Sequence, residues 1–113
     1  MSASKSPIAI CTYRVIPGKE EDFLGLLRRH WPTLHELGLT TDEPAQVFRG
    51  QDEERKTYFV EILTWLDQKA PDTAHELPEV MAIWEPMGKL VEARLGRPAM
   101  EFPHLERVFL EGA

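Results

Sequence analysis

The sequence predicts an α+β fold in which a four-stranded antiparallel sheet carries two helices on one face. Runs rich in β-branched and aromatic residues stand at residues 8–16, 56–65 and 102–110. Between them lie two segments whose apolar residues recur every three or four positions, as on one face of a helix. The 113 residues are 42% hydrophobic and 28% charged, which fits a single domain over residues 1–113.

The chain is expected to begin with a frayed polar segment at residues 1–6, followed by a first strand at residues 8–16. The letters "PGKEED" then turn the chain, and their acidic residues suit the positive end of a helix dipole. Pro32 lacks an N–H group, so we expect the first helix to kink or restart near it and to stop at Gly38. Its predicted core-facing residues are Phe23, Leu26, Leu27, Trp31, Leu34 and Leu37.

A hairpin follows, because "PAQVFRGQDEERKTYFVEILTW" reads as a short strand, a polar turn and a long strand at about residues 56–65. In the long strand, alternation places Tyr58, Val60 and Ile62 on one side. It places Phe59, Leu63 and Trp65 on the other side. Both faces of this strand are therefore apolar, although two helices can cover only one face of a sheet.

The second helical region is expected to be two helices in series. Thr73 and Glu76 have the spacing of a capping box, His75 ends the first helix, and Pro78 begins the second. Gly96 is the predicted end of the second helix. The predicted core-facing residues of that helix are Val80, Ile83, Trp84, Met87, Leu90 and Val91.

A last strand is predicted at residues 102–110, with Pro103 near its start. The resulting order βαββαβ is that of the ferredoxin-like fold. Because the sheet face away from the helices is also apolar, a second copy of the sheet is its simplest cover, and the chain is expected to be a homodimer.

The net charge of −6 and the pI near 5.2 oppose binding to a phosphate backbone, so nucleic acid is not expected as a partner. No stretch is long and apolar enough to cross a bilayer, and no secretory signal stands at the start, so no membrane association is expected. The single cysteine, Cys11, excludes an internal disulfide. These features predict a soluble cytoplasmic protein.

The segments "YRVIPGKEEDFLGLL", "YFVEILTWLDQ" and "AHELPEV" resemble the antibiotic biosynthesis monooxygenase-like group of dimeric α+β barrels, over about residues 8–110. The resemblance implies a homodimer whose two sheets face each other, with a small-molecule pocket between each sheet and its own helices. The group includes cofactor-free oxygenases of polyphenolic polyketides, heme-degrading oxygenases, isomerases and proteins of no assigned reaction.

The heme-degrading branch of that group has an Asn on its first strand, and a Trp followed by an axial His on its second helix. Here Cys11 stands at the matching strand position, and His75 precedes Trp84. The chain thus departs from that pattern, and no bound cofactor is expected. Heme degradation, with His75 binding iron in another geometry, stays a third hypothesis. His30, His35, His75 and His104 are scattered without metal-ligand spacing, so no metal site is predicted either.

His75 and Tyr13 are the candidate catalytic residues. An imidazole at a helix junction can act as a general base or proton shuttle, because its pKa lies near neutrality. The alternative is that His75 only caps free carbonyl groups at the end of its helix. Alternation places Tyr13 on the helix side of the first strand, where its hydroxyl could orient a substrate.

A cavity for a flat aromatic ligand is predicted between the sheet and the helices. The alternative is that the same aromatic side chains simply fill the core. Cys11 lacks a predicted base and is expected to be inert. The candidate substrate-binding residues are Cys11, Trp31, Tyr58, Met81 and Trp84.

Glu61 interrupts the apolar long strand on the same side as Phe59 and Leu63, taken here as the dimer face. A buried carboxylate must be paired or neutral. Arg14 on the first strand is predicted to share that face, so an ion pair between Glu61 and Arg14 is expected to fix the register of the dimer, in preference to a catalytic role.

Two functions from different classes follow. The first is a small-molecule enzyme, a cofactor-independent monooxygenase-like oxidoreductase or an isomerase of an aromatic or carbonyl compound. It needs few protein groups, because a deprotonated substrate can itself supply an electron to oxygen. The second is a non-catalytic dimeric ligand-binding or structural module. An open cavity with His75 at its wall favours the first function, and a collapsed core favours the second.

Overall fold

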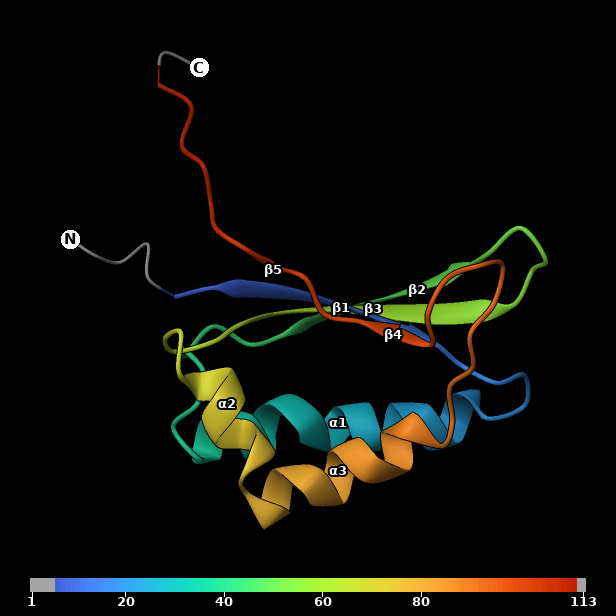
Figure 1. Ribbon diagram of the computed structural model, residues 1–113, viewed down its shortest axis with the longest axis horizontal. Helices are drawn as coiled ribbons and strands as arrows, with labels where there is room; N and C mark the ends of the chain where they lie inside the picture. The colour runs from blue at the N-terminus through green and yellow to red at the C-terminus, as the bar shows by residue number, and fades with distance from the viewer. Residues whose placement is uncertain (1–5, 112–113) are drawn as a thin grey trace.

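The structure is a computed structural model and describes residues 6–111 of the chain. One sheet forms a layer, and all the helices lie on the same side of it (Figure 1). The elements in chain order are β1 (Ile8–Arg14), α1 (Glu20–Glu36), β2 (Gln46–Gln51), β3 (Thr57–Thr64), α2 (Ala70–His75), α3 (Pro78–Gly88), β4 (Met100–Glu101) and β5 (His104–Leu105). None of the described helices is both long and apolar enough to span a membrane.

The sheet has the strand order β2-β3-β1-β4, and β5 also pairs with β1. All of these pairs are antiparallel. The predicted α+β fold with a ferredoxin-like sheet is confirmed. The predicted frayed start at residues 1–6 falls almost wholly on residues outside the described range, and Ser6 donates a hydrogen bond from its hydroxyl to the Leu66 carbonyl.

Helix α1 begins after the Pro17–Gly18 turn, where Gly18 has a positive φ of 91°. Its buried face is made by apolar residues and by His30, with Phe23 and Leu34 fully enclosed. The helix runs through Pro32 without the predicted restart. Pro32 and Arg28, whose carbonyl loses its usual partner, are both exposed, so water can satisfy that carbonyl.

The pairing of β1 with β3 corrects the predicted sides of β3. Cys11 lies opposite Glu61 and Tyr13 lies opposite Phe59, so all four side chains share one face of the sheet. These side chains are buried, and that face is the one covered by the helices. The prediction for β1 was right, but the assignment of Phe59, Glu61, Leu63 and Trp65 to the dimer face was wrong.

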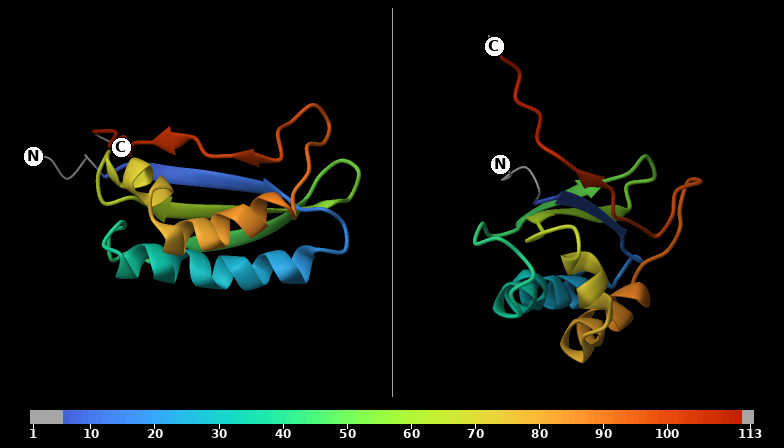
Figure 2. Two further views of the ribbon diagram at one scale, coloured as in Figure 1. Left: turned by 60° about the horizontal axis from the view of Figure 1, so that its bottom comes forward. Right: turned by 60° about the vertical axis from the view of Figure 1, so that its left-hand side comes forward.

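The opposite face of the sheet is only half-buried within this chain. Arg14 lies opposite Tyr58 there, and Tyr58 packs so closely over Gly50 that an added Cβ would come within 2.6 Å of its ring. Views from two further directions show no helix on this side (Figure 2). The half-buried apolar residues of the open face are Ile8, Ile10, Val60 and Ile62, and Phe48 is exposed on β2 beside them.

Helix α3 is shorter than predicted, whereas α2 ends at His75 as expected and begins at Ala70, before the predicted cap at Thr73. Helix α3 ends at Gly88, not near Gly96, because the following residues take an extended path beside the end of β1. There the Ile16 N–H donates to the Leu90 carbonyl at 2.8 Å, and Val91 forms a bridge with Val15. The apolar side chains of residues 90 and 91 thus reach the core from a loop.

The predicted last strand is broken into two short pieces. β4 and β5 flank Pro103, and both lie at the outer edge of β1, where a missing N–H is tolerated. Residues 106–111 form no strand and run away from the body on the side of the sheet opposite the helices (Figures 1 and 2). The apolar side chains of Val108, Phe109 and Leu110 are 71–78% exposed.

Candidate functional site

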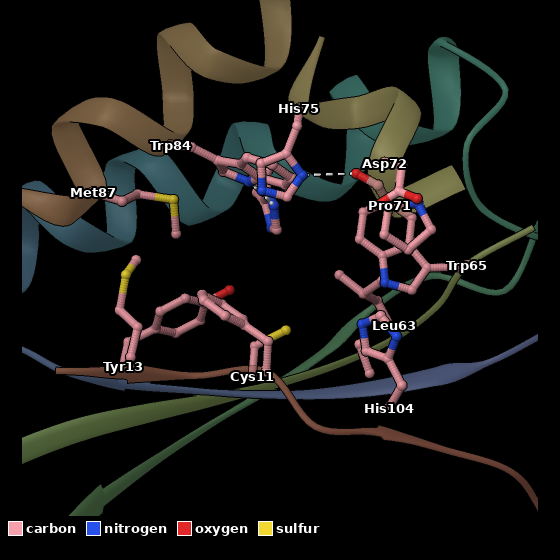
Figure 3. Close-up of a pocket in the computed structure, with 14 residues that line it drawn as sticks. Cys11, Tyr13, Leu63, Trp65, Pro71, Asp72, His75, Trp84, Met87 and His104 are labelled. Carbon is pink, nitrogen blue, oxygen red and sulfur yellow. Dashed lines mark hydrogen bonds between the residues drawn. The ribbon is translucent and has the colours of Figure 1, made fainter. Parts of the chain in front are cut away.

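A cavity of about 360 Å³ lies between the sheet and helices α2 and α3 (Figure 3). Its walls come from β1, β3, the helices and the β4–β5 segment, and most of the side chains are aromatic or aliphatic. The lining residues are Ala9, Cys11, Tyr13, His30, Leu63, Trp65, Pro71, Asp72, His75, Trp84, Met87, Met100, Phe102 and His104. An apolar cavity with few polar groups is typical of a small-molecule site.

A buried carboxylate lies behind this wall. Glu61 on β3 is 0% exposed. Its Oε1 accepts a hydrogen bond from the Tyr13 hydroxyl at 2.7 Å and lies 2.9 Å from Nδ1 of His30. The second oxygen, Oε2, is 3.1 Å from the same nitrogen. Two donors therefore satisfy a buried acid that would otherwise be costly to desolvate.

The contact between His30 and Trp84 fixes the tautomer of His30. The indole Nε1–H of Trp84 donates to Nε2 of His30 at 2.8 Å, and an indole nitrogen can only donate. Nε2 is therefore unprotonated, so Nδ1 carries the hydrogen and donates it to Glu61. The result is a continuous chain of hydrogen bonds from Tyr13 through Glu61 and His30 to Trp84.

His75 lies at the end of α2 and is exposed, with its ring at the cavity wall (Figure 3). Its Nδ1 lies 2.9 Å from the Pro71 carbonyl, so Nδ1 donates and Nε2 keeps a free lone pair. The ring meets the indole of Trp84 edge to face, with centroids 4.7 Å apart. His75 thus both bonds a helix carbonyl and borders the cavity.

Burial and the Glu61 charge keep Cys11 and Tyr13 at the cavity floor in their neutral forms. Burial, followed by the charge of Glu61, raises the pKa of the Cys11 thiol from 9.0 to about 12. The same two causes raise the pKa of the Tyr13 phenol well above its ordinary value of 10.0. Cys11 is therefore a thiol and not a thiolate near neutral pH, as the sequence led us to expect.

The structure brings together four of the predicted pocket residues, Cys11, Tyr13, His75 and Trp84. It places the other three elsewhere. Trp31 stacks on His35 with centroids 4.6 Å apart, and Tyr58 belongs to the open face of the sheet. Met81 is half-buried on α3 and does not line the cavity.

The predicted ion pair between Arg14 and Glu61 is wrong. The two side chains lie on opposite faces of the sheet, because Glu61 is opposite Cys11 while Arg14 is opposite Tyr58. Arg14 instead pairs with Glu101 of β4 and donates to the Pro98 carbonyl. Glu61 belongs to the site and not to the open face.

His30 was missed as a site residue. The available signal was its position, since it falls between Leu27 and Leu34 on the apolar face of α1 and is 3% exposed. A histidine on that face needs a polar partner in the core. Within residues 6–111, no three His, Cys, Asp or Glu side chains gather in an arrangement able to hold a metal ion.

Trp65 was also missed as a lining residue. It is 5% exposed, and its indole Nε1 is buried without a hydrogen-bond partner among the described residues. Such an unpaired donor is unusual in a folded protein and calls for a specific explanation. Because Trp65 borders the cavity, an acceptor atom bound there could satisfy it.

The solved structures similar to this chain include proteins of known class. The chain matches a crystal structure of an antibiotic biosynthesis monooxygenase with a TM-score of 0.69 and 16% identity, covering 90% of this chain and 98% of that one. It matches a mutant of SnoaB, a cofactor-independent oxygenase from Streptomyces nogalater, with a TM-score of 0.69 and 14% identity, covering 96% and 99%.

A third match is a protein of Pseudomonas aeruginosa, with a TM-score of 0.64 and 16% identity, covering 96% of this chain and all of that one (100%). No protein-family model and no curated protein matches the chain. At these identities the similarity shows the fold. The chain therefore has an antibiotic biosynthesis monooxygenase-like fold, in agreement with the resemblance seen in its sequence.

Proposed function

We propose that this chain is a small-molecule enzyme that oxidises or isomerises an aromatic or carbonyl compound without a bound cofactor. The observation that carries the proposal is the apolar cavity of about 360 Å³, which has ionisable and hydrogen-bonding groups at only a few points of its wall. Cavities of about 300 to 1,000 Å³ are the usual size of small-molecule sites. The fold of SnoaB, a cofactor-independent oxygenase, supports the same class of reaction.

The shape and chemistry of the wall favour a flat ligand. Tyr13, Trp65, Trp84 and Phe102 present aromatic surfaces to the cavity, and such surfaces stack on planar rings. The unpaired Nε1–H of Trp65 would donate to a carbonyl or phenolate oxygen of the ligand. An aromatic compound that carries an oxygen substituent fits both features.

The protein's share of the chemistry is to move a proton and to exclude water. A phenol or enol that has lost its proton is electron-rich and can itself pass an electron to dioxygen, the co-reactant. His75 is suited to a proton shuttle, because its Nε2 is free and its ring connects the cavity wall with solvent. Tyr13 and Trp84 orient the substrate in this proposal.

Oxygen uptake tests the proposal. The protein is mixed with a panel of dihydroxynaphthalenes and reduced hydroxyanthraquinones, and dioxygen consumption is followed together with the absorbance of the oxidised product. We expect turnover above the buffer rate with at least one compound, and a fall in kcat of about 10²-fold in a His75→Ala variant. His35→Ala is the matched control, because His35 lies outside the cavity beside Trp31 and Asp42.

A specific observation also favours the second function, a non-catalytic binding module. Glu61 and His30 are fully satisfied by partners within the chain, as they would be in a purely structural core. Ligand binding by calorimetry, with no dioxygen uptake and no conversion of any compound of the panel, would decide for this alternative and against the enzyme.

We also propose that two copies of the chain form a homodimer through the open face of the sheet. The half-buried Ile10, Val60 and Ile62 and the exposed Phe48 form an apolar surface there. Surfaces of this kind on soluble proteins are usually covered by a partner. The exposed apolar side chains of residues 108–110 lie on the same side of the sheet and support a partner there.

A further inference from the structure

We infer that Nε2 of His30 accepts the substrate's proton. Glu61 orients the His30 ring and stabilises its protonated form. Trp84 donates a hydrogen bond to the same Nε2 until the substrate hydroxyl replaces it. This inference rests on the proposed function, because it names the first proton acceptor within that cavity. His75 then has the later step of passing the proton to solvent.

The carboxylate of Glu61 supports His30 as a base. Both carboxylate oxygens lie within 3.1 Å of Nδ1, and the Tyr13 hydroxyl donates to Oε1 from the other side. Glu61 is wholly buried, and in the described part of the chain its one ion-pair partner is His30. A buried carboxylate at Nδ1 fixes the tautomer of an imidazole and stabilises the imidazolium that forms when Nε2 takes a proton.

The lone pair of Nε2 is the acceptor site, and Trp84 occupies it. The indole N–H lies 2.8 Å from Nε2, and both rings border the cavity. A substrate hydroxyl that donates to Nε2 would replace this hydrogen bond one for one. Trp84 is only half-buried, so its released N–H can find water or a substrate oxygen as its new acceptor.

The proton-transfer step balances in atoms and charge. The O–H bond of a phenolic substrate breaks, an N–H bond forms at Nε2 of His30, and the electron pair of the broken bond stays on the substrate oxygen. The imidazolium then lies between two anions, the phenolate and the Glu61 carboxylate. This arrangement follows the acid–histidine logic of known nucleophile-activating triads, with the substrate hydroxyl in the place of the serine.

His75 is less suited to this first step. It is exposed, and its Nδ1 donates to a neutral backbone carbonyl of Pro71 and not to a carboxylate. A carbonyl can orient the ring but stabilises an imidazolium much less than an ionised acid does. Of the two histidines in contact with Trp84, only His30 has a buried anionic partner.

A chromogenic phenol tests the inference without requiring turnover. The probe is a monohydroxyanthraquinone, whose visible band moves when the phenol ionises, and it is titrated into the protein over a range of pH in the absence of oxygen. In the unmodified protein we expect the bound phenol to ionise about one pH unit or more below the free phenol, which corresponds to a tenfold shift in its ionisation equilibrium. A Glu61→Gln variant should lose this shift, because the imidazolium is no longer stabilised.

A Trp84→Phe variant distinguishes two roles of Trp84, a hydrogen-bond donor that competes for Nε2 of His30 and a side chain that only lines the cavity. If the indole N–H competes for Nε2, its removal leaves the base open, and the bound phenol should ionise at a lower pH than in the unmodified protein. If Trp84 were only a wall, the variant would bind the probe more weakly with no change in its ionisation. His35→Ala is again the control, and circular dichroism checks that each variant is folded.

The outcomes also separate this inference from the proposed function. A bound phenol that stays neutral in both the unmodified protein and Trp84→Phe overturns the role of His30, as does oxygen uptake that persists unchanged in a folded His30→Gln variant. Ionisation that depends on Glu61 and increases in Trp84→Phe supports that role. If such ionisation occurs without oxygen uptake from any compound of the panel, the role of His30 stands and the oxygenase proposal fails.

Discussion

At the level of single residues, burial and the charge of Glu61 raise the pKa values of Cys11 and Tyr13 at the cavity floor. A carboxylate that is 0% exposed acts through a low-dielectric core, so its field on neighbouring groups is strong. Cys11 and Tyr13 lie on the same face of the sheet, next to it in the β1–β3 pairing. Both groups therefore resist ionisation, and each allows a direct test.

Cys11 is predicted to be unreactive in the folded protein. Its pKa is raised to about 12 and the residue is 4% exposed, so almost no thiolate is present at about pH 8. Iodoacetamide should label the chain slowly under native conditions and completely in denaturant, as read by mass spectrometry. The chain has a single cysteine, so the result is unambiguous. Rapid native labelling would contradict the buried position of Cys11.

Tyr13 is predicted to ionise late and to make the fold sensitive to alkali. Its pKa in the folded chain is raised well above 10.0, so above about pH 10 the folded state binds a proton that the unfolded state has lost. Stability should therefore fall as the pH rises beyond that value.

Tyrosinate absorbance and urea unfolding measure the two effects of Tyr13. A Tyr13→Phe variant should lose the late absorbance step and show a weaker decline of stability in alkali. The chain has two tyrosines, so the difference between the two titrations isolates Tyr13. A late step that survives in the variant would assign it to another residue.

At the level of elements, Arg94 ties together segments that meet at one end of the sheet. Its Nη1 and Nη2 donate to the carbonyls of Val15 and Thr57 at 2.8 Å each, and its Nε donates to Asp52 at 3.1 Å. Asp52 in turn accepts hydrogen bonds from two N–H groups of the β2–β3 turn. One buried guanidinium thus joins the residue after β1, the start of β3, that turn and the loop after α3.

An Arg94→Ala variant should destabilise the fold by about 3 kcal/mol, because it removes the buried guanidinium that donates to two carbonyl groups and pairs with Asp52. Chemical unfolding followed by tryptophan fluorescence measures the change. Arg97→Ala is the matched control. Arg97 is half-exposed and pairs with the exposed Glu53 at 3.4 Å, so its loss should cost less than about 1 kcal/mol. Equal losses in both variants would contradict the role of Arg94.

The elements also show where sequence reasoning stops. Alternation correctly separated Phe59 and Leu63 of β3, and Trp65 directly after it, from Tyr58 and Val60. Both sets are apolar, so the pattern could not tell which set faces the helices. That choice depends on the register with β1, where Cys11 meets Glu61, and register is a tertiary property. Because Glu61 was predicted to lie on the other face of the sheet, its contacts with Tyr13 and His30 were not predicted.

At the level of the whole molecule, the open sheet face predicts self-association. The chain should elute as a homodimer with a mass near twice 13.0 kDa by light scattering. A Val60→Glu substitution places a charge in the middle of the half-buried face and should shift the dimer towards monomer. Leu66→Glu, in an exposed loop outside the sheet, is the matched control. A stable monomer of the unmodified protein at micromolar concentration would refute the dimer.

The sequence by itself determined the order of strands and helices, the two-layer plan and the presence of aromatic residues between the layers. These features depend on local periodicity, turn residues and the net apolar content, which are all readable along the chain. Alternation on the first strand and helical spacing also predicted that Tyr13, His75 and Trp84 lie between the sheet and the helices, where they line the cavity.

Only the tertiary structure decided which face of β3 is covered, and so which residues meet at the cavity. The chain of hydrogen bonds from Tyr13 to Trp84 joins residues from β1, β3, α1 and α3, with sequence separations of 31 to 54 positions. Each of these polar side chains, taken alone, has several ways to be satisfied. The register of β1 with β3, together with the packing of α1 on the sheet, brings Tyr13 and His30 to the buried Glu61 carboxylate and so selects their partners.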